Sequence, residues 1–413
     1  CDNYGNIIYT LSSFKEEISH FNFYKYLLDK NNKIIDKNKE NSYKISKTSL
    51  KKILKNKVYS YFEFYKNFKL QELEVKFFKK NNIFKKNVLE NDNYKTNINN
   101  NYTSNNLESN NLNLNGFNEQ DYKLIYEGLL FGIREYFLNS GFKQAIIGLS
   151  GGIDSALCLV LAKFSISNVI PIIMPTKFNK KSSIDDAIKL CKNLNLDYFI
   201  IDINDFYFFL RNNLIERFSL NDSFDISDEN LQSRLRALIL MYYANKTNSL
   251  VIATSNKSEV SIGYFTLYGD SVGSIAPLKD LYKFQVYELA NYVNKIHNNV
   301  IPQEIISKPP SAELRENQKD EDDIPKYYIL DKVLYLHLEK NLDYKEIKGI
   351  LKQQGIDLKK EVYLDIVKRI YSNEYKRYQS PIGFKLSPLS FTKERRVPII
   401  NSFFYDIKRT LDF

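Results

Sequence analysis

The stretch AIIGLSGGIDS, residues 145–155, decides the fold that we expect for this chain. Its first five residues form an apolar run of the length of a buried strand, and a helical pattern begins near its end. Gly151 and Gly152 lie between the two, where glycine lets the backbone turn tightly because no Cβ is in the way. The stretch therefore predicts a strand, a tight loop and a helix in succession.

Further strands and helices lie on both sides of this unit. The expected strands are residues 145–149, 169–174, 198–203 and 250–254. The expected helices are residues 119–139, 154–164, 183–194 and 229–245, with residues 325–376 helical throughout. Strands that alternate with helices of this length indicate βαβ units. We therefore predict an α/β fold, a Rossmann-like parallel sheet with helices on both faces, whose ligands bind beyond the carboxyl ends of the strands.

The first expected helix has a clear apolar face. Its members are Leu124, Ile125, Leu129, Leu130, Ile133 and Phe137. Gly141 follows as the expected C-cap, since a residue just past a helix end often adopts the left-handed conformation that glycine tolerates.

The loop at residues 150–155 has the chemistry of a phosphate site. Backbone N–H groups of a glycine turn and of a helix N-terminus attract anions, and Ser150 and Ser155 add hydroxyl donors. Asp154 would repel phosphate unless a cation lay between them, so we expect a Mg²⁺ bridge there. An ordinary turn with an Asp/Ser cap is the alternative. The whole string, placed after a buried strand and before a helix, favours the phosphate site.

This loop resembles the pyrophosphate loop (PP-loop) of the ATP pyrophosphatases, which cleave ATP between the α- and β-phosphates and leave an adenylated substrate. That group includes GMP, asparagine and argininosuccinate synthetases, tRNA-modifying enzymes and NAD⁺ synthetases, and the loop does not choose among them. Three later runs resemble the core signature of the NAD⁺ synthetases: ATSNKSE (residues 253–259), GYFTLYGD (263–270) and APLKDLYK (276–283). The resemblance covers roughly residues 116–404 and implies the fold of the adenine nucleotide alpha hydrolases.

The resemblance also assigns residues to an ATP site. The implied ATP ligands are Ser150, Gly151, Gly152, Asp154, Ser155, Met174, Thr254, Lys283 and Ser311. Of these, Met174 and Thr254 would line the adenine. Asp154, Lys283 and Ser311 are the implied catalytic residues. Asp154 and Glu259 would hold Mg²⁺, the implied cofactor, with ATP as co-substrate.

A second substrate site follows from the same resemblance. The run ENLQSRLR, residues 229–236, resembles the helix of the family that meets the dinucleotide, and Asn230 and Arg234 match its binding positions. Asp270 resembles the residue that contacts the nicotinate of deamido-NAD. The implied reaction adenylates the nicotinate carboxylate, and ammonia then displaces AMP to give NAD⁺. Positioning and charge neutralisation would supply most of the rate.

The resemblance implies three regions along the chain. The run PPSAELRENQKDEDDIP, from residue 309, looks like the glutamine-dependent form, in which a nitrilase-like amidase domain supplies ammonia. Residues 1–27 resemble the tail of such a domain, and residues 119–413 would be the synthetase domain. Residues 28–118 are expected to be a Lys/Asn-rich, partly disordered linker. The catalytic residues of the amidase are not expected in this chain, and the family implies a homodimer through the synthetase domain.

Composition bears on partners and location. The chain of 413 residues has a net charge of +10, but residues 21–90 alone hold 18 Lys and no Arg against 7 acidic residues. Because nucleic-acid readers favour Arg, we do not expect nucleic acid as a partner. Cys1, Cys158 and Cys191 show no pairing pattern, which fits a reducing cytoplasm. No apolar run approaches the roughly 20 residues of a bilayer span, so we expect a cytoplasmic protein with no membrane partner.

Three other functions stay open on the sequence alone. Another PP-loop ATP pyrophosphatase, such as a tRNA-modifying enzyme, would use the basic segment to hold RNA, and tRNA would stimulate its ATP–pyrophosphate exchange. A non-enzymatic nucleic-acid-binding module built on residues 21–90 would bind DNA or RNA with strong salt dependence. A degenerate remnant would keep the fold without the activity, although the intact strings count against this.

Overall fold

The computed structural model describes residues 118–391, 395 and 397–412 of the chain. The expected amidase tail, residues 1–27, lies outside the described residues, and so does the expected linker, residues 28–118, apart from Asn118. Both assignments therefore stay predictions.

Four parallel strands form the sheet, in the order β3-β2-β1-β4. Their bounds are Gln144–Gly148 (β1), Asn168–Ile173 (β2), Phe199–Ile200 (β3) and Leu250–Val251 (β4). Within the register, Ala145 of β1 lies opposite Val169 on one side and Leu250 on the other. The predicted parallel α/β sheet is confirmed, and because all four strands run in one direction, their carboxyl ends meet at one edge.

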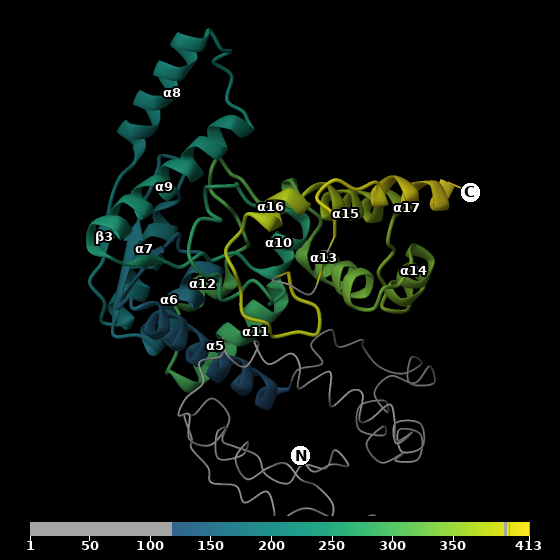
Figure 1. Ribbon diagram of the computed structural model, residues 1–413, viewed down its shortest axis with the longest axis horizontal. Coiled ribbons are helices and arrows are strands. Elements are labelled where there is room, and N and C mark those ends of the chain that lie inside the picture. The colour runs from purple at the N-terminus through teal and green to yellow at the C-terminus, as the bar shows by residue number, and fades with distance from the viewer. Residues whose placement is uncertain (1–117, 392–394, 396, 413) are drawn as a thin grey trace, which may run out of the picture. The chain divides into compact units, whose positions relative to one another are not determined.

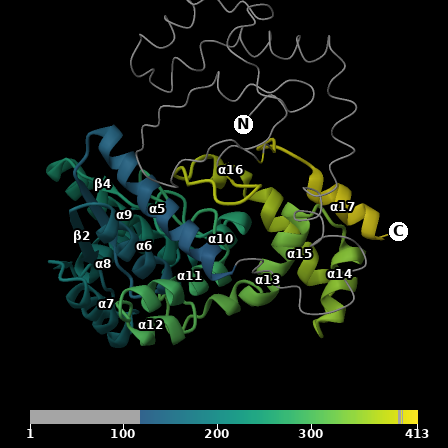
Figure 2. The ribbon, with the colours of Figure 1, turned by 90° about the horizontal axis from the view of Figure 1, so that it is seen from below.

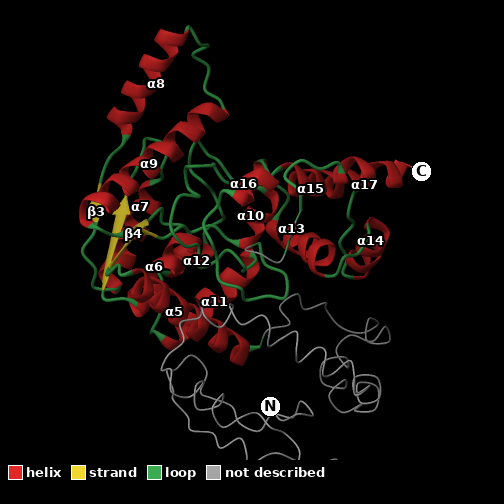
Figure 3. Cartoon of the chain, viewed as in Figure 1, coloured by secondary structure: helices red, strands yellow, loops and turns green. Residues whose placement is uncertain are grey.

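The outer two strands are shorter than expected, as Figure 3 makes plain beside the long helices. Backbone pairing nevertheless continues past both of them. Ile201 N–H donates to Ile173 O over 2.9 Å, and Ile252 N–H donates to Ile146 O over 2.9 Å. The expected strands at residues 198–203 and 250–254 were therefore correct in place and too long in extent.

Helices cover both faces of the sheet. Neighbouring residues of β1 point in opposite directions, so Ala145 and Ile147 pack into one buried cluster and Ile146 into another. The first cluster is formed with α5 (Glu119–Ser140), α6 (Ile153–Ser165), α7 (Lys181–Asn193) and α11 (Lys283–Ile296). The second is formed with α8 (Asn204–Phe218) and α9 (Ile226–Thr247).

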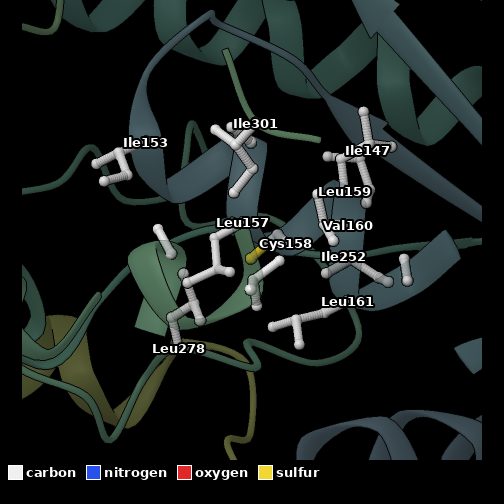
Figure 4. Close-up of a cluster of buried hydrophobic side chains, with 14 of the residues drawn as sticks. Ile147, Ile153, Leu157, Cys158, Leu159, Val160, Leu161, Ile252, Leu278 and Ile301 are labelled. Carbon is white, nitrogen blue, oxygen red and sulfur yellow. The ribbon is translucent and has the colours of Figure 1, made fainter. Parts of the chain in front are cut away.

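Helix α6 is the most deeply buried of these helices, and Figure 4 shows its apolar side chains around Cys158. Cys158 and Cys191 are both buried and unpaired. Burial raises the pKa of the Cys158 thiol well above its usual range, with Asp154 and Glu259 adding to the effect. Such a thiol stays protonated and unreactive, so the role of Cys158 is packing.

Helix α5 begins and ends as its sequence predicts. The Asn118 side chain accepts hydrogen bonds from the N–H groups of Gln120 and Asp121, and Gly141 ends the helix with a φ of +78°. The expected apolar face needs one correction: Leu124 is 46% exposed, because it lies on the flank of the helix, while Ile125 is buried.

Helix α8 is absent from the sequence-based expectation. Only Tyr207 among its residues is buried, so the helix does not pack an apolar stripe into the core. Its place is fixed by Tyr207 and Arg211, which both donate hydrogen bonds to Asp228 of α9. In Figure 1 α8 stands out beside α9 at the upper left.

The C-terminal helices pack around a separate apolar cluster. They are α13 (Tyr327–Leu334), a π-helical turn (Tyr335–Glu339), α14 (Tyr344–Gln353), α15 (Lys360–Ser372) and α17 (Phe403–Asp412), while α16 (Glu374–Tyr378) contributes no residue to this cluster. Figures 1 and 2 both set α13, α14, α15 and α17 to one side of the sheet. The expectation of continuous helix over residues 325–376 was wrong in detail, because left-handed residues at Asn341 and Gly355 reverse the chain between helices.

Three short helical segments link these parts: α10 (Lys257–Ile262), α12 (Gln303–Ser307) and a 3₁₀ turn (Asp320–Asp322). In the part of the chain that the structure describes, no helix is long and apolar enough to cross a membrane.

Candidate active site

The loop between β1 and α6 has a shape that only glycine allows. Gly151 has a φ of +81°, and a Cβ built on it would lie 2.1 Å from the carbonyl oxygen of Ser183. Ser150 Oγ accepts a hydrogen bond from Gly152 N–H over 3.2 Å, and Ser155 Oγ donates to Gly152 O over 3.0 Å. The N-cap residue of α6, Gly152, makes no side-chain cap bond. The first N–H groups of α6 therefore suit an anion.

Two carboxylates and one ammonium meet at the mouth of this loop. Lys283 Nζ forms an ion pair with Asp154 and lies 3.4 Å from Glu259 Oε1. Asn256 Nδ2 donates to Asp154 Oδ1 over 3.0 Å, and Asn256 also caps α10, the helix that carries Glu259. The fold thus brings together Asp154, Glu259 and Lys283, of which Asp154 and Lys283 lie 129 positions apart in the sequence.

Burial and mutual charge set the protonation of this group. Burial raises the pKa of Glu259 to about 8, Lys283 opposes that rise, and Asp154 and Asp320 add to it. Burial disfavours the Lys283 ammonium, but the carboxylates of Asp154 and Glu259 outweigh burial, so the pKa of Lys283 is raised. The single Lys283 ammonium thus lies between two carboxyl groups. The raised pKa favours the protonated form of Glu259, and additional positive charge in the site would favour its ionised form.

Asp320 is a third acid in the same place, and it was not among the predicted site residues. Tyr327 OH donates to Asp320 Oδ2 over 3.0 Å and lies 3.5 Å from Glu259 Oε1. Burial raises the pKa of Asp320, and Lys283 opposes that rise. No signal in the sequence separates Asp320 from its acidic neighbours in residues 320–323.

The donor set fits a hard cation. Asp154 and Glu259 offer carboxylate oxygens that already share one positive charge, and Mg²⁺ is usually held by one or two carboxylates together with substrate phosphates. Within residues 118–412, the described side chains include no group of three or more His, Cys, Asp and Glu that could hold a metal. A cation here would need its remaining ligands from phosphate and water.

A cavity of about 270 Å³ joins these groups. Its lining includes all of the predicted site residues except Asn230 and Arg234. Met174 lies at the end of β2, and its carbonyl oxygen accepts a hydrogen bond from Arg236 Nε over 2.9 Å. Gly148 and Leu240 also line the cavity and pack closely, since a Cβ on Gly148 would lie 3.2 Å from the Leu240 side chain.

The three residues predicted to bind the dinucleotide all form hydrogen bonds within or to one turn, residues 266–270. Asp270 Oδ1 accepts hydrogen bonds from Thr266 N–H over 2.7 Å and from Ser233 Oγ over 3.2 Å. Asn230 Oδ1 accepts from Thr266 Oγ1 over 2.7 Å, and Arg234 Nε donates to Leu267 O over 3.3 Å. Asp270 therefore faces the cavity, while the other two support the same turn from α9.

Comparison with known proteins decides the family. A family model described as NAD synthase matches residues 125–380. This chain belongs to the NAD synthase family. It is 43% identical over 293 residues to the glutamine-dependent NAD(+) synthetase of Aquifex aeolicus. That alignment covers 70% of this chain and 50% of the relative. It is 42% identical over 282 residues to that of Thermotoga maritima, which covers 68% and 48%.

A solved structure supports the fold. The glutamine-dependent NAD(+) synthetase from Cytophaga hutchinsonii superposes with a TM-score of 0.63 at 18% identity, over 71% of this chain and 56% of that one. The chain spans about half the length of the curated relatives it matches. These matches do not favour a tRNA-modifying enzyme.

For this NAD synthase family member, the structure adds residues of the loop 308–320 to the predicted set. Lys308, Glu313 and Asp320 line the cavity beside the predicted Ser311. Ser311 Oγ donates to Gln318 O over 2.6 Å, so the loop closes on itself. The run KPPSAELR could have pointed to Lys308 and Glu313, but the contacts of these residues cannot be read from one sequence.

Proposed function

We propose that this chain is an ATP-dependent NAD⁺ synthase, which adenylates the nicotinate carboxylate of deamido-NAD and lets ammonia displace AMP. The products are NAD⁺, AMP and pyrophosphate. The observation that carries the proposal is the meeting of Asp154, Glu259 and Lys283 at the mouth of a glycine loop. An ammonium and two acids beside free helix N–H groups suit a triphosphate better than a neutral ligand.

The phosphates would lie along Ser150, Gly151, Gly152 and Ser155, which offer N–H and hydroxyl donors. Lys283 would hold a phosphate oxygen, because its ammonium is buried and already fixed in the cavity. Ser311 would add a hydroxyl from the opposite wall. Met174 and Thr254, which line the same cavity, would contact the adenine.

Mg²⁺ is the proposed cofactor, held by Asp154 and Glu259. When bound, the ion would neutralise charge on the phosphates and orient them for in-line attack. The chain's own part is to supply two carboxylates that Asn256 and Lys283 hold in place. Burial and the neighbouring Asp154 carboxylate raise the pKa of Glu259 to about 8, and added positive charge would favour the ionised form.

Deamido-NAD would bind on the α9 side, along Asn230, Arg234 and Asp270. Burial raises the pKa of the Asp270 carboxyl. A raised pKa makes this carboxyl easier to protonate, and a protonated carboxyl could donate a hydrogen bond to the nicotinate carboxylate. Arg234 would meet a phosphate through its fork of donors.

The proposal extends to the whole protein. Residues 119–413 would be the synthetase domain, and in a longer protein glutamine would supply the ammonia through an amidase domain. The chain would act in the cytoplasm, where the buried thiols of Cys158 and Cys191 stay reduced. It would pair as a homodimer, supported by the apolar side chains that α8 and α9 expose.

ATP–pyrophosphate exchange tests the reaction. We expect exchange that depends on deamido-NAD, and NAD⁺ formation once ammonium is added. Asp154→Asn should lower the exchange rate by about 10²–10³-fold, because the site loses one carboxylate ligand of the proposed Mg²⁺, which would otherwise neutralise the phosphates. The fold should survive, since the Asp154 side chain is partly exposed at the start of α6, and circular dichroism would check this.

Two results would count against the proposal. Exchange stimulated by tRNA in place of deamido-NAD would identify a different ATP pyrophosphatase. Undiminished turnover of Asp154→Asn with saturating ammonium would remove Asp154 from the metal site.

A further inference from the structure

The loop 308–320 forms one wall of the cavity and is bound to helix α7 at two points. At its start, Lys308 Nζ lies 2.8 Å from Asp186 Oδ2 and donates to Ser183 Oγ over 3.0 Å. Further along, Glu313 Oε1 accepts a hydrogen bond from Ser183 Oγ over 2.7 Å. Ser183 therefore receives both contacts, and its carbonyl oxygen also lies against Gly151 of the pyrophosphate loop.

Glu313 completes the N-terminus of α7. The N-cap residue Lys180 makes no side-chain cap bond of its own. Glu313 Oε2 instead accepts from Lys180 N–H over 3.3 Å and from Asn179 Nδ2 over 3.3 Å. A carboxylate in this position is favoured because the helix N-terminus carries partial positive charge.

The backbone of Glu313 is strained in the conformation that makes this contact. Its φ is +49°, in the left-handed region that a residue with a side chain rarely adopts. Only 7% of the residue is exposed. If this buried carboxylate turned into the cavity, it would repel bound phosphate. Its hydrogen bonds instead hold it against α7, and backbone strain kept at such a place suggests a functional role.

We propose that Glu313 is a positioning residue, which latches the loop 308–320 onto the N-terminus of α7 and so holds Lys308 and Ser311 at the ATP phosphates. Lys308 Nζ already lies 3.3 Å from the carbonyl oxygen of Gly151, next to where the phosphates would bind. The part of this inference that concerns ATP binding rests on the proposed function. The latch itself does not depend on that function.

The other side of the loop is bound independently. Two residues of α9 hold it there. Gln232 Nε2 donates to Leu314 O over 2.9 Å, and Glu229 Oε1 lies 2.6 Å from Arg315 Nη1. Loss of the Glu313 carboxylate should therefore free the α7 side of the loop without unfolding it. That separation makes the latch testable.

Amide hydrogen exchange measures the latch without any substrate. In Glu313→Ala, exchange in residues 309–319 should quicken at least about tenfold, the change that loss of one buried hydrogen bond to a charged group produces. Glu313→Gln keeps one acceptor for Ser183 Oγ and should show a smaller change. Glu316→Ala removes the same charge from an exposed position in the same loop and should exchange like the wild type.

Kinetics with saturating ammonium separate positioning from general stability. KM for ATP should rise about tenfold in Glu313→Ala and less in Glu313→Gln, while KM for deamido-NAD stays within about twofold. Ser183→Ala should shift both readouts in the same direction and more weakly. The double variant should show less than the sum of the two single effects, because both remove the same contact.

The latch would be overturned if Glu313→Ala and Glu316→Ala showed the same amide hydrogen exchange and the same KM for ATP. A loss of thermal stability that leaves the ratio of the two KM values unchanged would also overturn it. If Glu313→Ala does not fold, Ser183→Ala and Glu313→Gln decide by the same criteria. A wild-type protein without ATP–pyrophosphate exchange would instead contradict the proposed function, and hydrogen exchange would still test the latch.

Discussion

At the scale of single residues, Asp270 is held in one direction by its neighbours. Thr266 N–H and Ser233 Oγ both donate to its carboxyl group. Gly269 makes this approach possible, since a Cβ there would lie 2.3 Å from Ser233 Oγ. The geometry thus fixes one oxygen and leaves the carboxyl group directed at the cavity.

Asp270→Ala should weaken the binding of deamido-NAD at least about tenfold and that of ATP less than about twofold, because the lost contact is to the nicotinate alone. Titration calorimetry with each substrate would measure both dissociation constants. Asp270→Asn is the matched control, since its amide oxygen can still accept the hydrogen bond of Thr266. Equal weakening of both substrates in Asp270→Ala would refute the assigned role.

At the scale of elements, three helices meet at one buried acid. Asp331 of α13 accepts hydrogen bonds from Ser258 of α10 and from Phe284 N–H at the start of α11. Burial raises the pKa of Asp331 to about 7, although the two hydrogen bonds oppose that rise. The junction therefore ties α10, which carries Glu259, to the C-terminal helices.

This junction should make stability depend on pH. The folded pKa of Asp331 lies above its ordinary value, so the folded chain binds the extra proton, and its contribution to stability is lost as pH rises toward about 7. The free energy of unfolding of the wild type, minus that of Asp331→Asn, should fall by at most about 1.4 kcal/mol per pH unit between pH 5 and 7. Urea unfolding at several pH values would measure it. A difference that is flat or rises with pH would show that Asp331 is ionised in the fold.

Sequence patterns predicted the elements whose burial is strong and local. Helix α5 has an apolar stripe and both caps, so residues 119–139 were expected within one residue of the observed end. Helix α8 was missed because its sequence has several exposed aromatic residues and a single buried one, Tyr207. Its position depends on Asp228, whose contacts with α8 exist only in the fold.

The candidate site divides in the same way. Asp154 and Glu259 stand at strand ends in recognisable runs, and parallel strands bring such ends to one edge. Asp320 could not be assigned from the sequence, and neither could the contacts of Glu313. Asp320 is held by Tyr327, seven residues further along the chain, and Glu313 is held by Ser183, 130 residues away.

At the scale of the whole molecule, α8 and α9 expose apolar side chains that a monomer would leave in water. The exposed residues are Phe206, Phe209 and Leu210 on α8 and Leu238, Met241 and Tyr242 on α9. Within each helix they recur at intervals of three or four, so each helix presents an apolar stripe. Exposed apolar side chains gathered on one face of a helix are typical of protein interfaces, and a stripe that repeats on two copies can pair with itself about a two-fold axis.

Sedimentation equilibrium should therefore find a dimer of the wild-type chain at micromolar concentration. Phe209 is 71% exposed, and Phe209→Glu should raise the dissociation constant of the dimer at least about thirtyfold, because a charge would be buried in an apolar contact. Leu138→Glu is the matched control, since Leu138 on α5 is 69% exposed and lies outside the two stripes. A wild-type monomer, or a Phe209→Glu variant as dimeric as Leu138→Glu, would exclude pairing through α8 and α9.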